Sequence, residues 1–146
     1  PEDISPSLKL NGYKEGLMSS GMAIDDKYIV CGLSNNFYCG YYAMQKYMEL
    51  MELPDGIVCA TDDIAIGCLK QCQNFEIKIP DDIALIGFNG IELLNTYSPS
   101  ISSICQPMQA VANALVSLLM DNIKYGNENK QMRLLHCDLL PRESTG

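Results

Sequence analysis

Hydrogen-bonding side chains follow two short apolar segments near the middle of the chain. Residues 57–60 are apolar and lead into Thr61, Asp62 and Asp63, while residues 83–86 lead into a Gly-Phe-Asn-Gly sequence. Hydroxyl, carboxylate and amide groups can hydrogen-bond the hydroxyls of a small molecule, and neighbouring carboxylates can perform acid–base chemistry. These residue types therefore indicate either a polar ligand site or a catalytic site.

The segments that carry these groups have the pattern of parallel strands. Both are apolar on both faces, and an amphipathic helical pattern lies between them, with Leu69 and Cys72 on its apolar side. This alternation is typical of an α/β fold with a parallel sheet and helices on both faces. Ligands of such sheets bind beyond the carboxyl ends of the strands. Asp62 and Asp63 then have two interpretations of equal weight, as caps of the next helix or as part of the site.

No catalytic constellation is visible in the sequence. The paired aspartates at 62–63 and 81–82 are explained more simply by a helix cap and a Pro-Asp turn. Ser144 and Thr145 have no histidine base beside them, because His136 lies in a strand pattern. The glycines around Phe-Asn do not have the spacing of a dinucleotide-binding loop. We therefore predict that the chain is not an enzyme and holds no cofactor.

Length and charge limit the class of protein. The 146 residues, 47% of them hydrophobic, fit one domain or a piece of a larger one. A formal net charge of −8 argues against direct nucleic-acid binding, which normally needs a basic face. No apolar run is long enough to span a membrane and no signal peptide is visible. Pro1 is not an initiator methionine, so we expect a trimmed amino terminus.

The cysteines indicate a reducing compartment. There are seven, no two are spaced as Cys-x-x-Cys, and most lie in apolar runs. An odd number without regular spacing is not typical of a secreted disulfide framework. Cys68 and Cys72 lie one helical turn apart and could bind a metal, but with the only histidine at 136 we interpret them as packing residues. We expect buried, reduced thiols in a cytoplasmic protein.

The other elements follow from periodicity and turn residues. Met44, Tyr47, Met48 and Met51 form an apolar stripe that we interpret as core, and Gly21 is placed as a helix C-cap. A short helix is expected around Leu93 and Leu94, loops over 1–7 and 126–130, and a polar tail over 141–146. We predict helices over 8–20, 39–52 and 107–125, and strands over 28–31, 101–105 and 133–140.

Four ordered motifs together resemble a known family. They are T-D-D-I-A-I-G from Thr61, I-P-D-D-I-A-L-I-G-F-N-G from Ile79, S-P-S-I-S-S-I-C-Q-P-M from Ser98, and the terminal R-E-S-T-G. Their order and the helix between the last two resemble the effector-binding domain of LacI/GalR-type transcriptional repressors, near its carboxyl terminus. The resemblance covers nearly the whole chain, and residues 9–12 look like the R-x-x-G segment of the first helix.

The resemblance implies a type I periplasmic-binding-protein-like fold, here incomplete, with two α/β lobes and the effector between them. Residues 1–100 would form the carboxyl-terminal lobe without its first strand. Residues 101–138 would cross into the amino-terminal lobe, and 139–146 would return. The resemblance also implies a homodimer that contacts DNA only through an amino-terminal helix-turn-helix, which this sequence does not contain, and that does not contact a membrane.

The absent strand creates a physical problem. It would lie between the strands at 28–31 and 57–60, and each buried backbone group left unpaired there costs about 1–3 kcal/mol. We therefore expect that a partner or a rearrangement fills the gap, or that the chain was cut from a longer one. The helix over 107–125 would also lack its lobe, so its exposed leucines should favour association or swapping.

The resemblance further implies five effector-binding positions: Lys9, Asn35, Thr61, Asn89 and Gln106. Lys9 stands where sugar binders of the family usually have arginine, Asn89 where they have aspartate, and Asn35 where an aromatic side chain often stacks on the ligand. Asn, Gln and Thr supply the paired donors and acceptors that sugar hydroxyls need. A sugar or sugar phosphate is the expected effector, and an atypical effector or a protein co-regulator stays open.

The chain is therefore interpreted as the effector-sensing and dimerising portion of a LacI/GalR-like transcriptional regulator. The alternative is the sugar-binding protein of a transporter, which shares the fold. A secretion signal or a helix-turn-helix upstream would distinguish these two functions. Seven cysteines without a disulfide pattern favour the cytoplasmic regulator.

Overall fold

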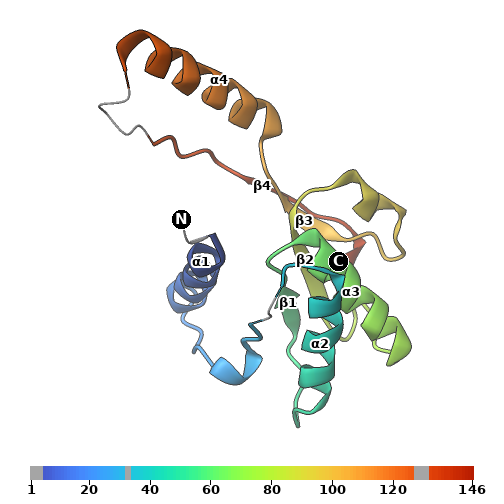
Figure 1. Ribbon diagram of the computed structural model, residues 1–146. Coiled ribbons are helices and arrows are strands. Elements are labelled where there is room, and N and C mark those ends of the chain that lie inside the picture. Colours follow the sequence, from blue (N-terminus) through green and yellow to red (C-terminus); the bar gives the residue numbers. More distant parts are fainter. Residues whose placement is uncertain (1–4, 32–33, 127–131) are drawn as a thin grey trace.

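The chain contains a four-stranded sheet, on which helices pack (Figure 1). The structure, a computed structural model, describes residues 5–31, 34–126 and 132–146. The strand order is β1-β2-β3-β4, with the first three strands parallel and β4 antiparallel to β3. This confirms the α/β prediction, and it confirms that 57–60 and 83–86 contribute neighbouring parallel strands. The strands are β1 (Gly56–Val58), β2 (Ala84–Asn89), β3 (Ser102–Cys105) and β4 (Asp138–Leu140).

Helices lie on both sides of β2. Gly87 faces α3, because a Cβ at Gly87 would lie 3.4 Å from the Cβ of Ala65. Phe88 points to the opposite face, as alternation along a strand requires, and there it meets Lys9 of α1. The helices are α1 (Ser5–Ser19), α2 (Phe37–Met48), α3 (Asp62–Asn74) and α4 (Met108–Tyr125), with short 3-10 turns η1 (Asp26–Tyr28), η2 (Glu92–Thr96) and η3 (Glu143–Thr145).

The helix ends match their capping residues. Thr61 caps α3 by accepting from the Ile64 amide at 3.3 Å. Gly21 follows α1 with a φ of 72°, and the next amide, that of Met22, donates back to the Leu17 carbonyl at 2.9 Å. This is the Schellman arrangement expected of a glycine after a helix, so the C-cap prediction for Gly21 is confirmed.

The core lies between α2, α3 and the sheet. Met44, Cys72, Ile83 and Leu94 are fully buried, and the short helix predicted around Leu94 is present as η2. The prediction that the second half of the apolar stripe, Met48 and Met51, lies in the core is wrong. The helix ends at Met48, so Met51 lies beyond it and is fully exposed.

The strand predicted over 28–31 is not formed. Tyr28 closes η1 and residues 29–31 have no strand partner, although the Tyr47 hydroxyl donates to the Tyr28 carbonyl at 3.0 Å. A strand needs a neighbour for its backbone groups. Within the described ranges no strand pairs with the outer edge of β1, where Val58 is 57% exposed. The position expected between β1 and 28–31 is thus unfilled, and 28–31 lacks its neighbouring strand.

The carboxyl-terminal part differs from the prediction in two ways. Only Asp138–Leu140 of the predicted strand 133–140 pairs, because β3 ends at Cys105, opposite Asp138. The segment predicted as a polar tail is anchored instead of free. Ser144 is 0% exposed, and its hydroxyl donates to the Leu85 carbonyl at 2.5 Å and accepts from the Ser102 amide at 2.8 Å.

Helix α4 extends away from the sheet (Figure 1), and none of its residues is buried. Its length confirms the helix predicted over 107–125, with Pro107 at the N-cap. Among the described helices, none has both the length and the apolarity to cross a bilayer. The predicted loops at 1–7 and 126–130 fall partly outside the described residues, and 5–7 belongs to α1.

Candidate functional site

Lys9 reaches the carboxyl end of the sheet from α1. Its Nζ donates to the Ala60 carbonyl at 2.9 Å and lies 4.2 Å from the centre of the Phe88 ring. Ala60 lies two residues after the end of β1 and Phe88 precedes the last residue of β2, so the ammonium group lies beside two strand ends. An ammonium has three N–H donors, which leaves two of them for a ligand.

Asn89 and Gln106 form a pair across the ends of β2 and β3. Gln106 Nε2 donates to Asn89 Oδ1 at 3.0 Å, and the Gln106 amide meets the Asn89 carbonyl at 3.5 Å. The pairing leaves the Asn89 Nδ2 donors and the Gln106 Oε1 acceptor for other groups. Two predicted site residues are therefore in direct contact and present complementary hydrogen-bonding atoms.

Thr61 and its two acidic neighbours have different environments. The Thr61 hydroxyl caps α3 and still has its own hydrogen to donate. Asp63 is exposed in the first turn of the helix. Asp62 is 1% exposed, and its carboxylate accepts from the Ser103 hydroxyl at 2.6 Å and the Ile91 amide at 2.9 Å. Both of its oxygens are thus engaged within the protein.

Asn35 is not brought into contact with the other four candidates. It is exposed, two residues before α2, and makes no hydrogen bond within the described part of the chain. The adjacent Asn36 is the residue that caps α2, accepting from the Tyr38 amide at 3.1 Å. The structure therefore groups Lys9, Thr61, Asn89 and Gln106 at the strand ends and leaves Asn35 on a separate loop.

The buried thiols are packing groups. Cys59 Sγ lies 3.9 Å from Cys68 Sγ, and this contact together with burial raises the pKa of Cys59. Burial raises the pKa of Cys72 to about 12. In the described ranges no three His, Cys, Asp or Glu side chains are grouped so that they could hold a metal. All seven cysteines are free, but only these three are buried, fewer than the sequence predicted.

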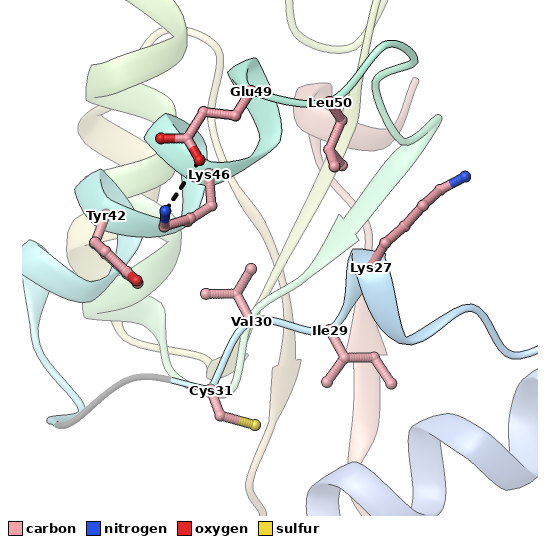
Figure 2. A pocket seen from close by; sticks show the side chains of 8 residues that line it. All are labelled: Lys27, Ile29, Val30, Cys31, Tyr42, Lys46, Glu49 and Leu50. Atoms are coloured by element: carbon pink, nitrogen blue, oxygen red, sulfur yellow. Dashed lines mark hydrogen bonds and ion pairs between the residues drawn. The ribbon is translucent and has the colours of Figure 1, made fainter.

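An open pocket of about 470 Å³ lies elsewhere, between α2 and the segment that follows η1 (Figure 2). Figure 2 shows Lys46 paired with Glu49, with an Nζ–Oε2 distance of 3.0 Å. None of the five predicted site residues lines this pocket, and the sequence patterns did not indicate it. Its lining residues are Lys27, Ile29, Val30, Cys31, Tyr42, Lys46, Glu49 and Leu50.

Sequence reasoning missed two contributors to the strand-end site, Phe88 under Lys9 and Ser103 beside Asp62. Both stand in apolar or small-residue runs and give no local signal of a polar site. Hydrogen-bonding groups on three strand ends can hold a neutral or anionic polar ligand.

Comparison with known proteins gives a consistent result. Residues 5–145 match the family described as periplasmic binding protein-like domain. The chain is 32% identical over 137 residues to the HTH-type transcriptional repressor CytR of Escherichia coli, covering 94% of this chain and 40% of that protein. It is 32% identical over 136 residues to the ribose operon repressor of Haemophilus influenzae, covering 93% and 41%. The chain thus spans about two fifths of these relatives.

A solved structure agrees. A LacI-type transcription regulator from Bifidobacterium animalis subsp. lactis superimposes with a TM-score of 0.89 at 25% identity, over 97% of this chain and 51% of that one. The fold of this chain therefore corresponds to that of about half of a longer LacI-type regulator.

Proposed function

We propose that this chain forms part of the site where a regulator binds its small-molecule effector, because the chain belongs to the periplasmic binding protein-like family of LacI-type transcriptional regulators. One observation carries the proposal. Four of the five expected contact residues come together at the carboxyl ends of the parallel strands, where open α/β sheets bind ligands. Asn35 would join them as the fifth contact.

The chemistry of these groups favours a sugar or a sugar phosphate. Asn89, Gln106 and Thr61 offer uncharged donors and acceptors suited to hydroxyl groups. Lys9 offers a point charge that tolerates either a hydroxyl or a phosphate oxygen, in contrast to the planar two-pronged contact of arginine. The name of one relative, a ribose operon repressor, supports the sugar class.

The rest of the function depends on the parent protein. We propose that the parent is a cytoplasmic homodimer that contacts DNA through a helix-turn-helix outside this sequence, since a chain with a net charge of −8 is poorly suited to bind DNA itself. Residues 1–100 and 139–146 would belong to one lobe and 101–138 to the other. Effector binding would then shift the population between two lobe arrangements.

A thermal-shift screen of the full-length regulator tests the proposal. The panel contains D-ribose, D-glucose, cellobiose and the 5- or 6-phosphates of the first two. A true effector at one hundred times its Kd should stabilise the protein by about 2.7 kcal/mol. Stabilisation by none of them, together with stabilisation by a phosphocarrier protein, would show that the partner is a protein.

A matched pair of variants locates the site. Asn89→Ala should reduce the stabilisation, because it removes the amide that pairs with Gln106. Asn95→Ala makes the same chemical change on an exposed side chain of η2 and should leave the stabilisation unchanged. Equal responses from the two variants would place the effector elsewhere.

A further inference from the structure

Asp62 is a buried carboxylate whose two oxygens both accept hydrogen bonds from within the protein. It opens α3, is 1% exposed, and divides its two oxygens between different elements. Oδ1 accepts from the Ser103 hydroxyl on β3 at 2.6 Å, and Oδ2 accepts from the Ile91 amide after β2 at 2.9 Å. The Ser103 oxygen in turn accepts from the Gly90 amide at 3.1 Å. One side chain therefore controls two consecutive amides of the turn that follows β2.

The sheet makes room for this carboxylate. A Cβ on Gly87 would lie 2.3 Å from Asp62 Oδ1, so β2 has no side chain at the point where the carboxylate enters. Within residues 5–31, 34–126 and 132–146 no lysine, arginine or histidine forms an ion pair with Asp62. A buried charge is tolerated only with strong hydrogen bonds, and here they are supplied by the Ile91 amide of the turn and by Ser103. The positive end of the α3 dipole also favours a negative charge at this position.

The turn itself needs such support. Asn89 has a φ of 129° and Gly90 a φ of 78°, and the first value is sterically costly for a residue with a side chain. On its other side the turn is closed by β3, because a Cβ on Gly90 would lie 2.7 Å from Cys105 Sγ. The residues that follow Asn89 are therefore held from both sides, and Asn89 adopts its rare backbone conformation next to this fixed turn.

We infer that Asp62 is a positioning residue of the effector site: its carboxylate holds the turn at 90–91 and so fixes the side-chain amide of Asn89 against that of Gln106. This inference rests on the proposed function for its consequence in binding. Asp62 does not touch the effector. It sets where the Asn89 donors and the Gln106 acceptor point, so the geometry of the ligand contact depends on it.

Hydrogen–deuterium exchange on the full-length regulator tests the positioning without any ligand. Asp62→Asn replaces one oxygen by an NH2 group, which faces either the Ser103 hydroxyl or the Ile91 amide, and the latter pairing sets donor against donor. Asp63→Asn is the matched control, because it removes the same charge from the same helical turn at an exposed position. Exchange at 90–91 should be about tenfold faster in Asp62→Asn than in Asp63→Asn, with α3 unchanged.

If Asp62→Asn does not fold, Ser103→Ala serves in its place. It removes the hydroxyl between Asp62 and the Gly90 amide and should accelerate exchange at Gly90. Exchange that is unchanged at 90–91, or that rises equally over α3 and the sheet, would show that the carboxylate only stabilises the fold, and would overturn the inference.

Calorimetry with D-ribose and D-ribose 5-phosphate as probes tests the consequence. Asp62→Asn should weaken binding about tenfold relative to Asp63→Asn, and should cause no further loss when combined with Asn89→Ala. Additive losses would mean that Asp62 does not act through Asn89, which contradicts the inference. Wild-type protein that binds neither probe would count against the proposed function, while the exchange comparison would still decide the role of Asp62.

Discussion

Lys9 connects three parts of the molecule with one side chain. Its ammonium group donates to the Ala60 carbonyl after β1 and lies over the Phe88 ring of β2. The residue belongs to α1, in which none of residues 7–19 is buried. A cation over an aromatic ring contributes roughly 0.5–1 kcal/mol at exposed sites and more when water is excluded. The residue that would meet the effector therefore also attaches α1 to the sheet.

Thiol reactivity at the residue scale should follow the environments of the cysteines. Hydrogen bonds to Ser34 lower the pKa of Cys39, whereas burial raises the pKa of Cys72 to about 12. The thiolate is the reactive form. Limiting iodoacetamide at pH 7 should therefore alkylate Cys39 well before Cys72, and the rate at Cys39 should rise at a lower pH than that of an ordinary thiol.

Peptide mass spectrometry would measure this order. In urea the two residues should react at similar rates, because unfolding removes both the hydrogen bonds and the burial. Labelling of folded Cys72 as fast as Cys39 would show that the core around α3 is open.

Helices α2 and α3 approach each other so closely at Gly40 and Gly67 that no larger residue fits at either position. A Cβ on Gly40 would lie 2.1 Å from the Ile64 carbonyl oxygen, and a Cβ on Gly67 would lie 2.1 Å from the Phe37 carbonyl oxygen. Both obstacles are backbone atoms, which cannot move aside as a flexible side chain can. The close approach lets Met44 and Cys72 meet, with 3.8 Å between their sulfur atoms.

Substitution of these glycines is a test at the scale of the element. Gly40→Ala or Gly67→Ala should lower the free energy of unfolding by about 3 kcal/mol, the upper end of the usual cost of overpacking. Gly16→Ala is the control, since no atom lies within 4 Å of its Cβ and the residue is inside α1. Gly16→Ala should raise the free energy of unfolding by about 0.5–1 kcal/mol, because alanine is the better helix former.

Urea denaturation followed by circular dichroism would give these differences. A small effect at both Gly40 and Gly67 would mean that α2 and α3 are separated by more than the structure shows. Destabilisation by Gly16→Ala would mean that α1 packs on another surface.

At the scale of the whole molecule, α4 leaves a large apolar surface uncovered. Leu115, Val116, Leu119 and Ile123 are each at least 60% exposed, and Met132 and Leu134 on the returning segment are more than 80% exposed. Soluble monomers rarely expose a continuous apolar surface of this kind. The proposed role of 101–138 in a second lobe would cover it in the parent protein.

The isolated 146-residue chain should therefore self-associate through α4. Leu115→Lys combined with Leu119→Lys places two charges on the apolar side of the helix and should shift sedimentation velocity towards the monomer. Asn113→Lys adds a charge to an exposed polar position of the same helix and should not. A monomeric wild-type chain at tens of micromolar would contradict this prediction.

Effector binding should also depend on the portion of the full-length regulator that lies outside this sequence. We proposed an effector site that lies between two lobes, and the isolated chain would supply only one side of such a site. Calorimetry on the isolated chain should therefore detect weak binding or none with any sugar that stabilises the full-length regulator. Equally tight binding by the isolated chain would show that this lobe alone forms the site.

The strand-end residues show how much could be predicted from sequence. Apolar runs ending at Thr61 and Asn89 correctly placed two parallel strands and a capped helix, because hydrophobic periodicity and capping are local properties. The same patterns gave Asp62 and Asp63 equal weight, and tertiary structure separated them by burying one carboxylate under β3 and leaving the other in solvent.

The sequence by itself determined the α/β class, the two parallel strands from 57–60 and 83–86, the helix cap at Thr61 and the family motifs, most of which depend on neighbouring residues. Only the tertiary structure decided that 28–31 would not become a strand, that Ser144 would be buried, and that Asn89 would pair with Gln106. Each of these outcomes depends on whether a partner distant in sequence is present, and a backbone or amide group adopts its final hydrogen bonds only when that partner arrives.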